Sequence, residues 1–464
     1  MTTQQYIDAN RERYLEELFK LLRIPSVSTD KHHDDDTHAC AVLLQTFMAR
    51  AGLENVSLYP TDGHPIVYAD KIIDPALPTV LIYGHYDVQP AAPLDQWVSG
   101  PFEPEIRKTE RHPEGAIFAR GSTDDKGQMF IHVKAVEAMI QTDTLPCNVK
   151  FMIEGEEEVG SPNLEPFILK YKDMLAADVI LVSDTSLLGK DVPSITVGLR
   201  GLTYLDVKIT SARADMHSGL FGGAVANPIN TLCEMVASLK DEKKHITIPG
   251  FYDDVHFPSD ADREMMRNAP FDAQEYMDSP GVFGLDGEEG FHTYERTGIL
   301  PTLDCNGIWG GFTEEGSKTI IPAVANAKIS MRLVSKQNYE KITELFTAHF
   351  KSIAPASVKV EVHPHHGGNP YVTPTDTPEY QAASAAMEEA FGRIPVPMYE
   401  GGSIPIIANF KEILGIESIL MGFGFDTDGL HSPNEHFGVW NFNKGIDTVP
   451  RFFTKYAEMK AASA

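Results

Sequence analysis

The sequence predicts an α/β domain with a mostly parallel central sheet, interrupted by a smaller α+β domain with an antiparallel sheet. In the first part of the chain, short apolar runs typical of buried strands alternate with segments of helical periodicity. From about residue 194 the strands instead alternate apolar and polar residues, as half-exposed antiparallel strands do. A chain of 464 residues is also long for one hydrophobic core, so two domains are expected.

The first predicted domain begins with an amphipathic helix and continues with buried strands. Apolar residues recur at helical spacing over 14–22, and apolar runs at 80–83, 151–153 and 179–182 predict three strands. A helix is predicted from about Lys126, between the first two of these strands. Ligands bind such sheets beyond the carboxyl ends of the strands, and polar clusters follow each of the three runs.

The second predicted domain is inserted into the first. Alternating strands are expected around 205–209, 329–333 and 358–362, with helices from Asn227-Pro228 and over about 339–350. Regular α/β character then returns, because Thr377-Pro378 starts a helix that Gly392 ends, and a strand follows at 419–421. We therefore expect residues 1–195 and 372–464 to form the first domain and residues 196–371 to form the second.

Charge and cysteine content restrict the partners and the location. The 66 acidic residues and 39 Lys and Arg give a formal charge of -27, a field that repels phosphate backbones and anionic membranes. We therefore expect no nucleic acid and no membrane as partner. The four cysteines show no CxxC spacing, the N-terminus does not resemble a secretory signal, and no long apolar run follows. These features predict a cytoplasmic protein.

Histidines and acidic residues form an ordered series of clusters, each directly after an apolar run or a Gly-rich turn. Zinc and manganese at hydrolytic sites bind imidazole nitrogens and carboxylate oxygens, often as a pair of ions about 3.5–4 Å apart. The series therefore predicts two divalent metal ions that share a carboxylate, with zinc as the first choice and manganese or cobalt as alternatives. The clusters are His85 with Asp87, Asp124 with Asp125, Glu157 with Glu158, Asp184, and His431.

The first two clusters can be read residue by residue. His85 and Asp87 are two residues apart at a strand end, so both side chains point to the same side. We expect His85 to bind metal and Asp87 to accept its second imidazole N–H, although an isolated His-x-Asp is often a surface or capping feature. Asp124 and Asp125 open a helix, where an N-cap would account for one of them. We expect Asp124 to bridge the two ions and Asp125 to support it.

The remaining clusters complete the predicted site. Adjacent carboxylates on an extended segment point in different directions, which suits Glu158 as a metal ligand and Glu157 as the base that deprotonates the bridging water. An acidic run can also be a solvated face, and a lone strand-end aspartate such as Asp184 can be a turn residue. With Asp184 and His431 as further ligands, three carboxylates and a hydroxide balance the charge of two divalent cations.

At these residues the chain closely resembles the co-catalytic metallopeptidase family that includes carnosinase, cytosolic nonspecific dipeptidase, aminoacylase, succinyl-diaminopimelate desuccinylase and glutamate carboxypeptidase. The match is collinear from about Thr79 to Glu435, with five motifs in order. The resemblance implies a catalytic α/β domain interrupted by a lid domain that commonly dimerises. It also implies a cis peptide between Asp124 and Asp125.

The resemblance further assigns ligands and roles. His85, Asp124 and Asp184 would bind one ion, and Asp124, Glu158 and His431 the other. Glu157 would be the general base, and Asp87 would stand behind His85. In the lid, His217 resembles the histidine that stabilises the tetrahedral intermediate from the partner subunit of a homodimer. Further residues resemble contacts to the substrate: Arg332, which could bind a terminal carboxylate, Thr319, His366 and Ser403.

Chain length and lid motifs favour the dipeptidase branch of this family. We therefore expect a two-metal hydrolase that cleaves dipeptides or short peptides with a free C-terminal carboxylate, using a metal-bridging hydroxide. An amidohydrolase acting on N-acyl or N-succinyl amino acids with the same site is the alternative. A non-catalytic metal-binding or scaffold protein would be expected to lack one of Glu157, Glu158 or Asp124, and all three are present.

Overall fold

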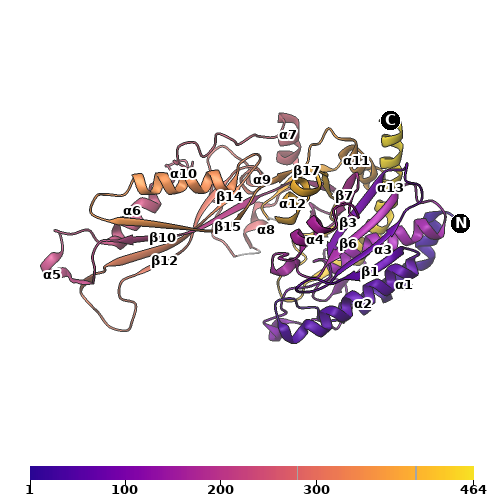
Figure 1. Cartoon of the computed structure of the whole chain (residues 1–464), viewed down its shortest axis with the longest axis horizontal. Helices are drawn as coiled ribbons and strands as arrows, with labels where there is room; N and C mark the ends of the chain where they lie inside the picture. The colour runs from indigo at the N-terminus through magenta and orange to yellow at the C-terminus, as the bar shows by residue number, and fades with distance from the viewer. Residues whose placement is uncertain (279–280, 403–404, 464) are drawn as a thin grey trace. The chain divides into compact units, whose positions relative to one another are not determined.

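The computed structural model of the chain describes residues 1–278, 281–402 and 405–463 and contains two compact units (Figure 1). The first unit consists of Met1–Val197, Thr373–Met398 and Asn409–Ala464, and the second of Gly198–Val372 and Tyr399–Ala408. The expected boundaries therefore differ from this division mainly at Tyr399–Ala408. That segment groups with the second unit, where the carbonyl of Gly402 accepts a hydrogen bond from the backbone N–H of Arg200 at 3.2 Å.

A nine-stranded sheet lies mostly in the first unit and has parallel strands at its centre. The strand order is β1-β2-β6-β3-β7-β18-β9-β16, and β17 pairs with β9. Pairing is parallel among β6, β3, β7 and β18 and antiparallel toward both edges, which confirms the predicted mostly parallel core. The strands are β1 (Glu54–Tyr59), β2 (Ile66–Lys71), β3 (Thr79–His85), β6 (Asn148–Glu154), β7 (Val179–Val182), β9 (Ser194–Leu199), β16 (Tyr371–Val372), β17 (Val396–Glu400) and β18 (Ser418–Leu420).

Helices cover both faces of this sheet. A side chain at Gly84 of β3 would come within 3.0 Å of Met129 on α3, whereas the neighbouring Tyr83 packs its ring 5.0 Å from that of Phe410 on α12. Because successive strand residues face opposite sides, α3 and α12 lie on opposite faces. The helices are α1 (Thr3–Leu22), α2 (Asp34–Ala51), α3 (Lys126–Gln141), α4 (Leu164–Lys170), α11 (Pro378–Phe391), α12 (Pro405–Leu414) and α13 (Val439–Ser463).

Local sequence signals account for several element ends. The side chain of Thr377 caps α11 by accepting a hydrogen bond from the backbone N–H of Tyr380, and Gly392 ends the helix in the left-handed conformation, as predicted. Short strands and 3-10 turns connect the larger elements. They are η1 (Lys31–His33), η2 (Leu94–Gln96), β4 (Glu105–Arg107), β5 (Ala116–Phe118), η3 (Glu157–Val159), β8 (Ser186–Leu187), β19 (Gly424–Phe425) and β20 (His436–Gly438).

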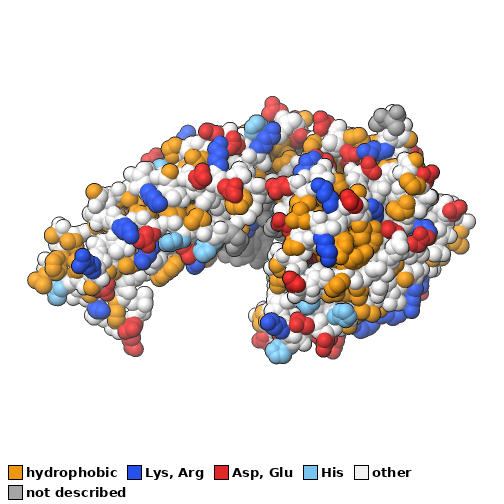
Figure 2. All heavy atoms as spheres, viewed as in Figure 1, with side chains coloured by type: hydrophobic (Ala, Val, Ile, Leu, Met, Phe, Trp, Pro, Cys, Tyr) orange, Lys and Arg blue, Asp and Glu red, His pale blue; other side chains and the backbone are white. Residues whose placement is uncertain are grey.

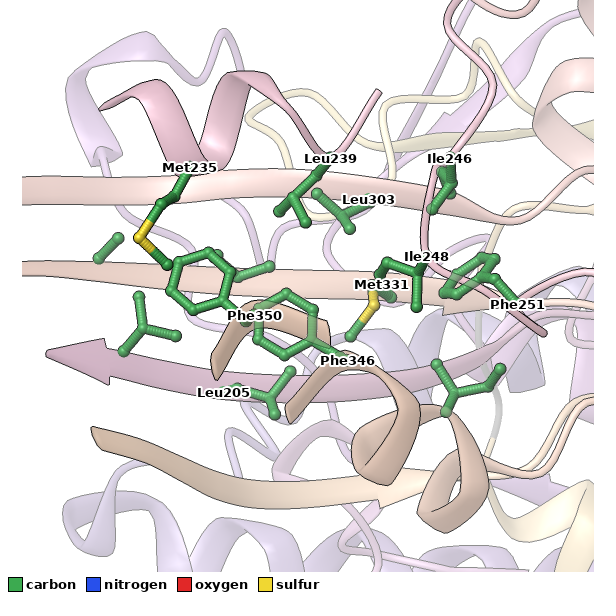
Figure 3. Close-up of a cluster of buried hydrophobic side chains, with 14 of the residues drawn as sticks. Leu205, Met235, Leu239, Ile246, Ile248, Phe251, Leu303, Met331, Phe346 and Phe350 are labelled. Carbon is green, nitrogen blue, oxygen red and sulfur yellow. The ribbon is translucent and has the colours of Figure 1, made fainter. Parts of the chain in front are cut away.

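The second unit is built on a four-stranded antiparallel sheet in the order β12-β14-β10-β15, which confirms the predicted α+β domain. Burial alternates along β10 and β14, so one sheet face carries the core. In that core, Phe346 and Phe350 of α10 pack with Met331 and Leu205 of the sheet (Figure 3). The elements are β10 (Gly201–Thr210), β11 (Met216–His217), α5 (Ser218–Phe221), α6 (Pro228–Ala237), α7 (Asp260–Asn268), α8 (Ala273–Asp278), α9 (Thr293–Gly298), β12 (Thr302–Gly310), β13 (Ile320–Ile321), β14 (Val324–Leu333), α10 (Tyr339–Ser352) and β15 (Lys359–Gly368).

The surface carries both signs of charge. On the face shown in Figure 2, acidic and basic side chains are interspersed over each unit. Among the described helices, none combines the length and the apolar character needed to span a bilayer.

Candidate metal centre

Three parallel strands end at the same edge of the sheet and present the first predicted clusters there. His85 is the last residue of β3 and is paired in register with Glu154, the last residue of β6. The turn η3, which contains Glu157 and Glu158, follows β6 directly, and Asp184 lies two residues beyond the end of β7. The topology therefore brings together side chains that are up to 99 residues apart in the sequence.

His85, Asp124 and Asp184 form one group of possible ligands. The Nε2 atom of His85 lies 3.1 Å from Oδ1 of Asp124 and 3.8 Å from Oδ2 of Asp184. This nitrogen is buried and makes no hydrogen bond, so its orientation toward two carboxylates is that of a ligand atom rather than of an N–H donor. The donor set of one imidazole and two carboxylates fits a divalent transition metal.

A second group shares Asp124 with the first. The Nε2 atom of His431 lies 2.9 Å from Oδ2 of Asp124 and 3.4 Å from Oε2 of Glu158. Asp124 thus faces the two histidines with different oxygens, which is the arrangement expected of a bridging carboxylate. The ligand atoms within each group all lie within 4.8 Å of one another. The structure therefore brings together all five residues that the sequence predicted as ligands.

Asp87 has a wider role than the one predicted for it. The Nδ1 atom of His85 lies 3.1 Å from the backbone carbonyl oxygen of Asp87 and 3.3 Å from its Oδ1. The carboxylate itself accepts the backbone N–H groups of Glu157 and Glu158 at 3.2 and 3.1 Å, and the hydroxyl of Ser28 at 2.6 Å. This fully buried side chain therefore fixes both His85 and the turn that carries the two glutamates.

Glu156 and Glu158, on the turn after β6, have different hydrogen-bond partners. Glu156 accepts a hydrogen bond from Nδ2 of Asn163 at 2.8 Å. Glu158 accepts one from Nε2 of Gln89, also at 2.8 Å. Gln89 was not predicted from the sequence, although strand alternation beyond His85 and Asp87 would have placed it on the same side.

Glu435 was also missed, and it organises the turn that carries Asp124. Its buried carboxylate accepts the backbone N–H groups of Gly121 and Thr123 at 2.9 Å and that of Asp124 at 3.1 Å. It also pairs with the guanidinium of Arg120 at 2.8 Å. The peptide bond between Asp124 and Asp125 is cis, as the resemblance implied. Buried Asp125 supports the site by accepting the backbone N–H of His85 at 3.1 Å.

Burial and mutual repulsion shift the carboxyl groups of the site. Burial, together with the charges of Asp184 and Glu158, raises the pKa of Glu157 to about 8. Burial and the charge of Asp124 likewise raise the pKa of Glu158 to about 8 and that of Asp184 to about 6. Although Asp124 is buried, the imidazoles of His431 and His85 hold its pKa below the ordinary value. Bound cations would relieve this repulsion.

The predicted substrate contacts belong to the second unit or to its boundary. Exposed His217 is the last residue of β11, and Thr319 lies close to it, because the backbone N–H of the next residue, Ser218, donates to the carbonyl of Thr319 at 3.1 Å. Arg332 lies on β14, on the sheet face opposite the buried Met331 and Leu333. His366 belongs to β15, but its side chain is not among the described ones, and Ser403 lies outside the described residues.

Comparison with known proteins identifies the family. The family model "Peptidase family M20/M25/M40" matches residues 81–455. The chain belongs to this family. It is 32% identical to human Beta-Ala-His dipeptidase, over 98% of this chain and 92% of that protein. It is 31% identical to the Cys-Gly metallodipeptidase DUG1 of Saccharomyces cerevisiae, over 98% and 97%.

A solved structure agrees with these matches. The M20 family metallo-carboxypeptidase Sso-CP2 from Sulfolobus solfataricus has a TM-score of 0.80 and 30% identity, covering 96% of this chain and 99% of that one. Membership of the family confirms the resemblance inferred from the ordered metal-ligand motifs. The protein is thus a metallopeptidase of the dipeptidase branch.

Replacing Asp87 by Asn should weaken metal binding without removing a ligand. An amide offers only one oxygen to the two backbone N–H groups of Glu157 and Glu158, so the turn that positions Glu158 loses one of its anchors. We expect zinc affinity, measured by competition with a chromophoric chelator, to fall roughly 10–100-fold. Asp95→Asn at an exposed position is the matched control. An unchanged affinity in Asp87→Asn would show that the turn holds its shape without this carboxylate.

Proposed function

We propose that the protein is a two-metal dipeptidase that cleaves dipeptides or short peptides with a free C-terminal carboxylate. The observation that carries the proposal is the pair of ligand groups that share Asp124, with Glu157 on the turn beside them. The names of the two relatives describe hydrolysis of Beta-Ala-His and Cys-Gly, both dipeptides, which favours this reading over an amidohydrolase of N-acyl or N-succinyl amino acids.

His85, Asp124 and Asp184 would hold one divalent ion, and Asp124, Glu158 and His431 the other, with zinc as the first choice. The bound ions would polarise the scissile carbonyl and lower the pKa of the attacking water. Glu157 takes the proton of that water and returns it to the leaving amine. A base with a pKa near the working pH suits both transfers, and burial raises the pKa of Glu157 toward that range.

Arg332 is proposed to bind the C-terminal carboxylate of the substrate. Burial and the charge of Arg332 lower the pKa of Arg200 to about 10. The guanidinium of Arg200 therefore lies close enough to Arg332 to interact with it. Two cationic groups on one unit favour a bound anion, and a guanidinium matches the geometry of a carboxylate. Thr319, His366 and Ser403 are proposed as further substrate contacts.

His217 is proposed to act as a hydrogen-bond donor to the developing oxyanion in the partner subunit of a homodimer. Its Nδ1 atom accepts the backbone N–H of Gly219 at 3.0 Å. In a neutral imidazole the proton then resides on Nε2, which leaves an N–H donor on an exposed side chain. This tautomer supports the assignment of His217 as a donor. The second unit is proposed to be the lid through which the protein dimerises.

We also propose that the enzyme acts in the cytoplasm. All four cysteines are free thiols, and Cys233 and Cys305 are exposed. Exposed thiols persist in a reducing compartment.

Chelation followed by reconstitution, together with Glu157→Gln, tests the proposed activity. Removal of metal should abolish hydrolysis of Beta-Ala-His and Cys-Gly, and zinc, manganese or cobalt should restore it. Glu157→Gln should lower kcat by roughly 10²–10⁴-fold while both metal ions remain bound, because only the proton acceptor is removed. N-acetyl amino acids serve as the competing substrate class. Near-normal turnover in Glu157→Gln would rule out this base, and hydrolysis restricted to N-acetyl amino acids would rule out the dipeptidase.

Replacing Arg332 by Ala should discriminate between acid and amide substrates. We expect kcat/KM for a dipeptide with a free carboxylate to fall by roughly 10–100-fold, since a charge-assisted hydrogen-bond pair is lost. The corresponding dipeptide amide should be affected little. Steady-state kinetics on the matched acid and amide give the comparison, with Lys328→Ala on the same strand as control. Equal losses for both substrates would indicate a structural arginine.

Mixing two inactive variants tests the shared site. In one variant chain, His217→Ala should lower kcat by roughly 10²–10³-fold through loss of one oxyanion donor. In the second variant chain, Glu157→Gln removes the general base. If His217 acts across the interface, a mixed dimer contains one intact site, so mixing should restore activity. Subunit exchange is monitored by native mass spectrometry. Exchange without recovery would place His217 and Glu157 in the site of the same chain.

A further inference from the structure

A second cluster of histidine and carboxylate lies in the first unit, and none of its residues belongs to the proposed metal pair. His112 follows β4, Asp428 follows β19, and His436 begins β20. The Nε2 atom of His112 lies 3.3 Å from Oδ1 of Asp428, and Nε2 of His436 lies 3.8 Å from the same oxygen. Three segments that are distant in sequence therefore direct two imidazole nitrogens at one carboxylate oxygen.

The contact between His436 and Asp428 joins two hydrogen-bond acceptors. The Nδ1 atom of His436 lies 3.0 Å from the backbone carbonyl of Asn434, which can only accept, so Nδ1 carries the proton. In the neutral ring Nε2 is then a lone pair facing the oxygen of Asp428. Burial lowers the pKa of His436, which favours the neutral ring. A cation between the two atoms would convert this contact into two favourable bonds.

The charge of Asp428 also indicates a cation at this position. The carboxylate is fully buried, and its other oxygen accepts the backbone N–H of Phe425 at 2.9 Å. No lysine or arginine of the described chain pairs with it, and its ion-pair contacts come only from His112 and His436. A buried carboxylate without a cationic partner is costly unless a metal ion or a proton offsets its charge.

We propose that His112, Asp428 and His436 form a third metal site, separate from the pair, that binds one zinc-class divalent cation. Two imidazoles and one carboxylate are ligands that zinc prefers, with a water molecule as the fourth. Tetrahedral bonds of about 2.0–2.1 Å place neighbouring ligand atoms about 3.3 Å apart. The contact between His112 and Asp428 already has this length, and the 3.8 Å contact between His436 and Asp428 must shorten. The hydrogen bond from Nδ1 of His436 to a carbonyl is the outer contact that ligating histidines ordinarily make.

Packing holds the ligands in place. The ring of His112 stacks on that of Phe425, with the ring centroids 5.6 Å apart. It meets the ring of His436 edge-on, with the centroids 5.4 Å apart. A side chain at Gly438 would come within 2.5 Å of Nδ1 of His112, so a glycine is needed for this ring position. His112 is buried and His436 is 16% exposed, so an ion can enter from the side of His436.

This position suggests a structural function for the third ion. Asp428 and His436 are the two ends of the segment that carries His431, and the backbone N–H of His436 donates to the carbonyl of Asp428 at 2.9 Å. The hydroxyl of Thr123, next to Asp124, donates to the carbonyl of His436 at 2.7 Å. An ion bound here would link Asp428 and His436, the two ends of the segment that carries His431, to His112. The ion itself takes no part in catalysis.

Zinc stoichiometry of the full-length protein tests the proposal. Metal-stripped protein is dialysed against buffered free zinc, and bound zinc per chain is measured by inductively coupled plasma mass spectrometry. We expect three ions for the unaltered chain and two for His112→Gln and for His436→Gln. His38→Gln, at an exposed histidine of α2, is the matched control and should retain three. Two ions in the unaltered chain, or three in both site variants, would overturn the proposal.

Zinc-edge anomalous scattering from crystals of the unaltered protein gives a test that does not depend on variants folding. We expect a peak within bonding distance of Nε2 of His112, Nε2 of His436 and Oδ1 of Asp428. Absence of this peak in zinc-soaked crystals whose metal pair is occupied would show that His112 and Asp428 form only a hydrogen-bonded pair. The result is independent of whether the enzyme hydrolyses dipeptides.

Discussion

The metal-binding edge of the sheet depends on the buried carboxylate of Asp87, which receives the backbone N–H groups of Glu157 and Glu158. These hydrogen bonds join the end of β3 to the turn that follows β6. A buried carboxylate needs such donors, because without them its charge would be desolvated and uncompensated. The same residue lies against Nδ1 of His85, so one side chain sets the positions of a proposed ligand of each ion and of the proposed base.

Glu435 provides the corresponding constraint on the other side of the site. It accepts three backbone N–H groups of the turn before α3 and is neutralised by Arg120. Asp124 and His431 lie on segments more than 300 residues apart, and Glu435 holds the first of these segments next to the second. Both supporting carboxylates are thus hydrogen-bonded to the protein, which leaves Asp124, Glu158 and Asp184 available for cations.

The sequence was sufficient to predict the mostly parallel sheet and its helices. It also singled out the five side chains that the structure brings together, because His85, Asp124, Glu158 and Asp184 lie at or just beyond strand ends or at the start of a helix. It was not sufficient for contacts in which a side chain binds a distant backbone. Asp87 was expected to serve His85 alone, since the N–H groups of Glu157 and Glu158 come from another strand connection. Glu435 lies four residues after His431, but nothing in the sequence around Arg120 indicates that the two residues pair. The grouping of Tyr399–Ala408 with the second unit likewise involves a distant partner, since Gly402 accepts the backbone N–H of Arg200.

The exposure of His431 has a consequence for how the two proposed ions are held. Its side chain is 56% exposed and its backbone is left-handed at φ 56, whereas the side chains of His85, Asp124 and Asp184 are at most 13% exposed. A ligand on an exposed loop detaches more readily than one fixed at the end of a buried strand. The ion bound through His431 should therefore exchange with solvent faster than its neighbour. A protein with one retained and one exchangeable ion would lose its metals in two steps. The concentration of free metal in solution would then set the fraction of chains that hold both ions.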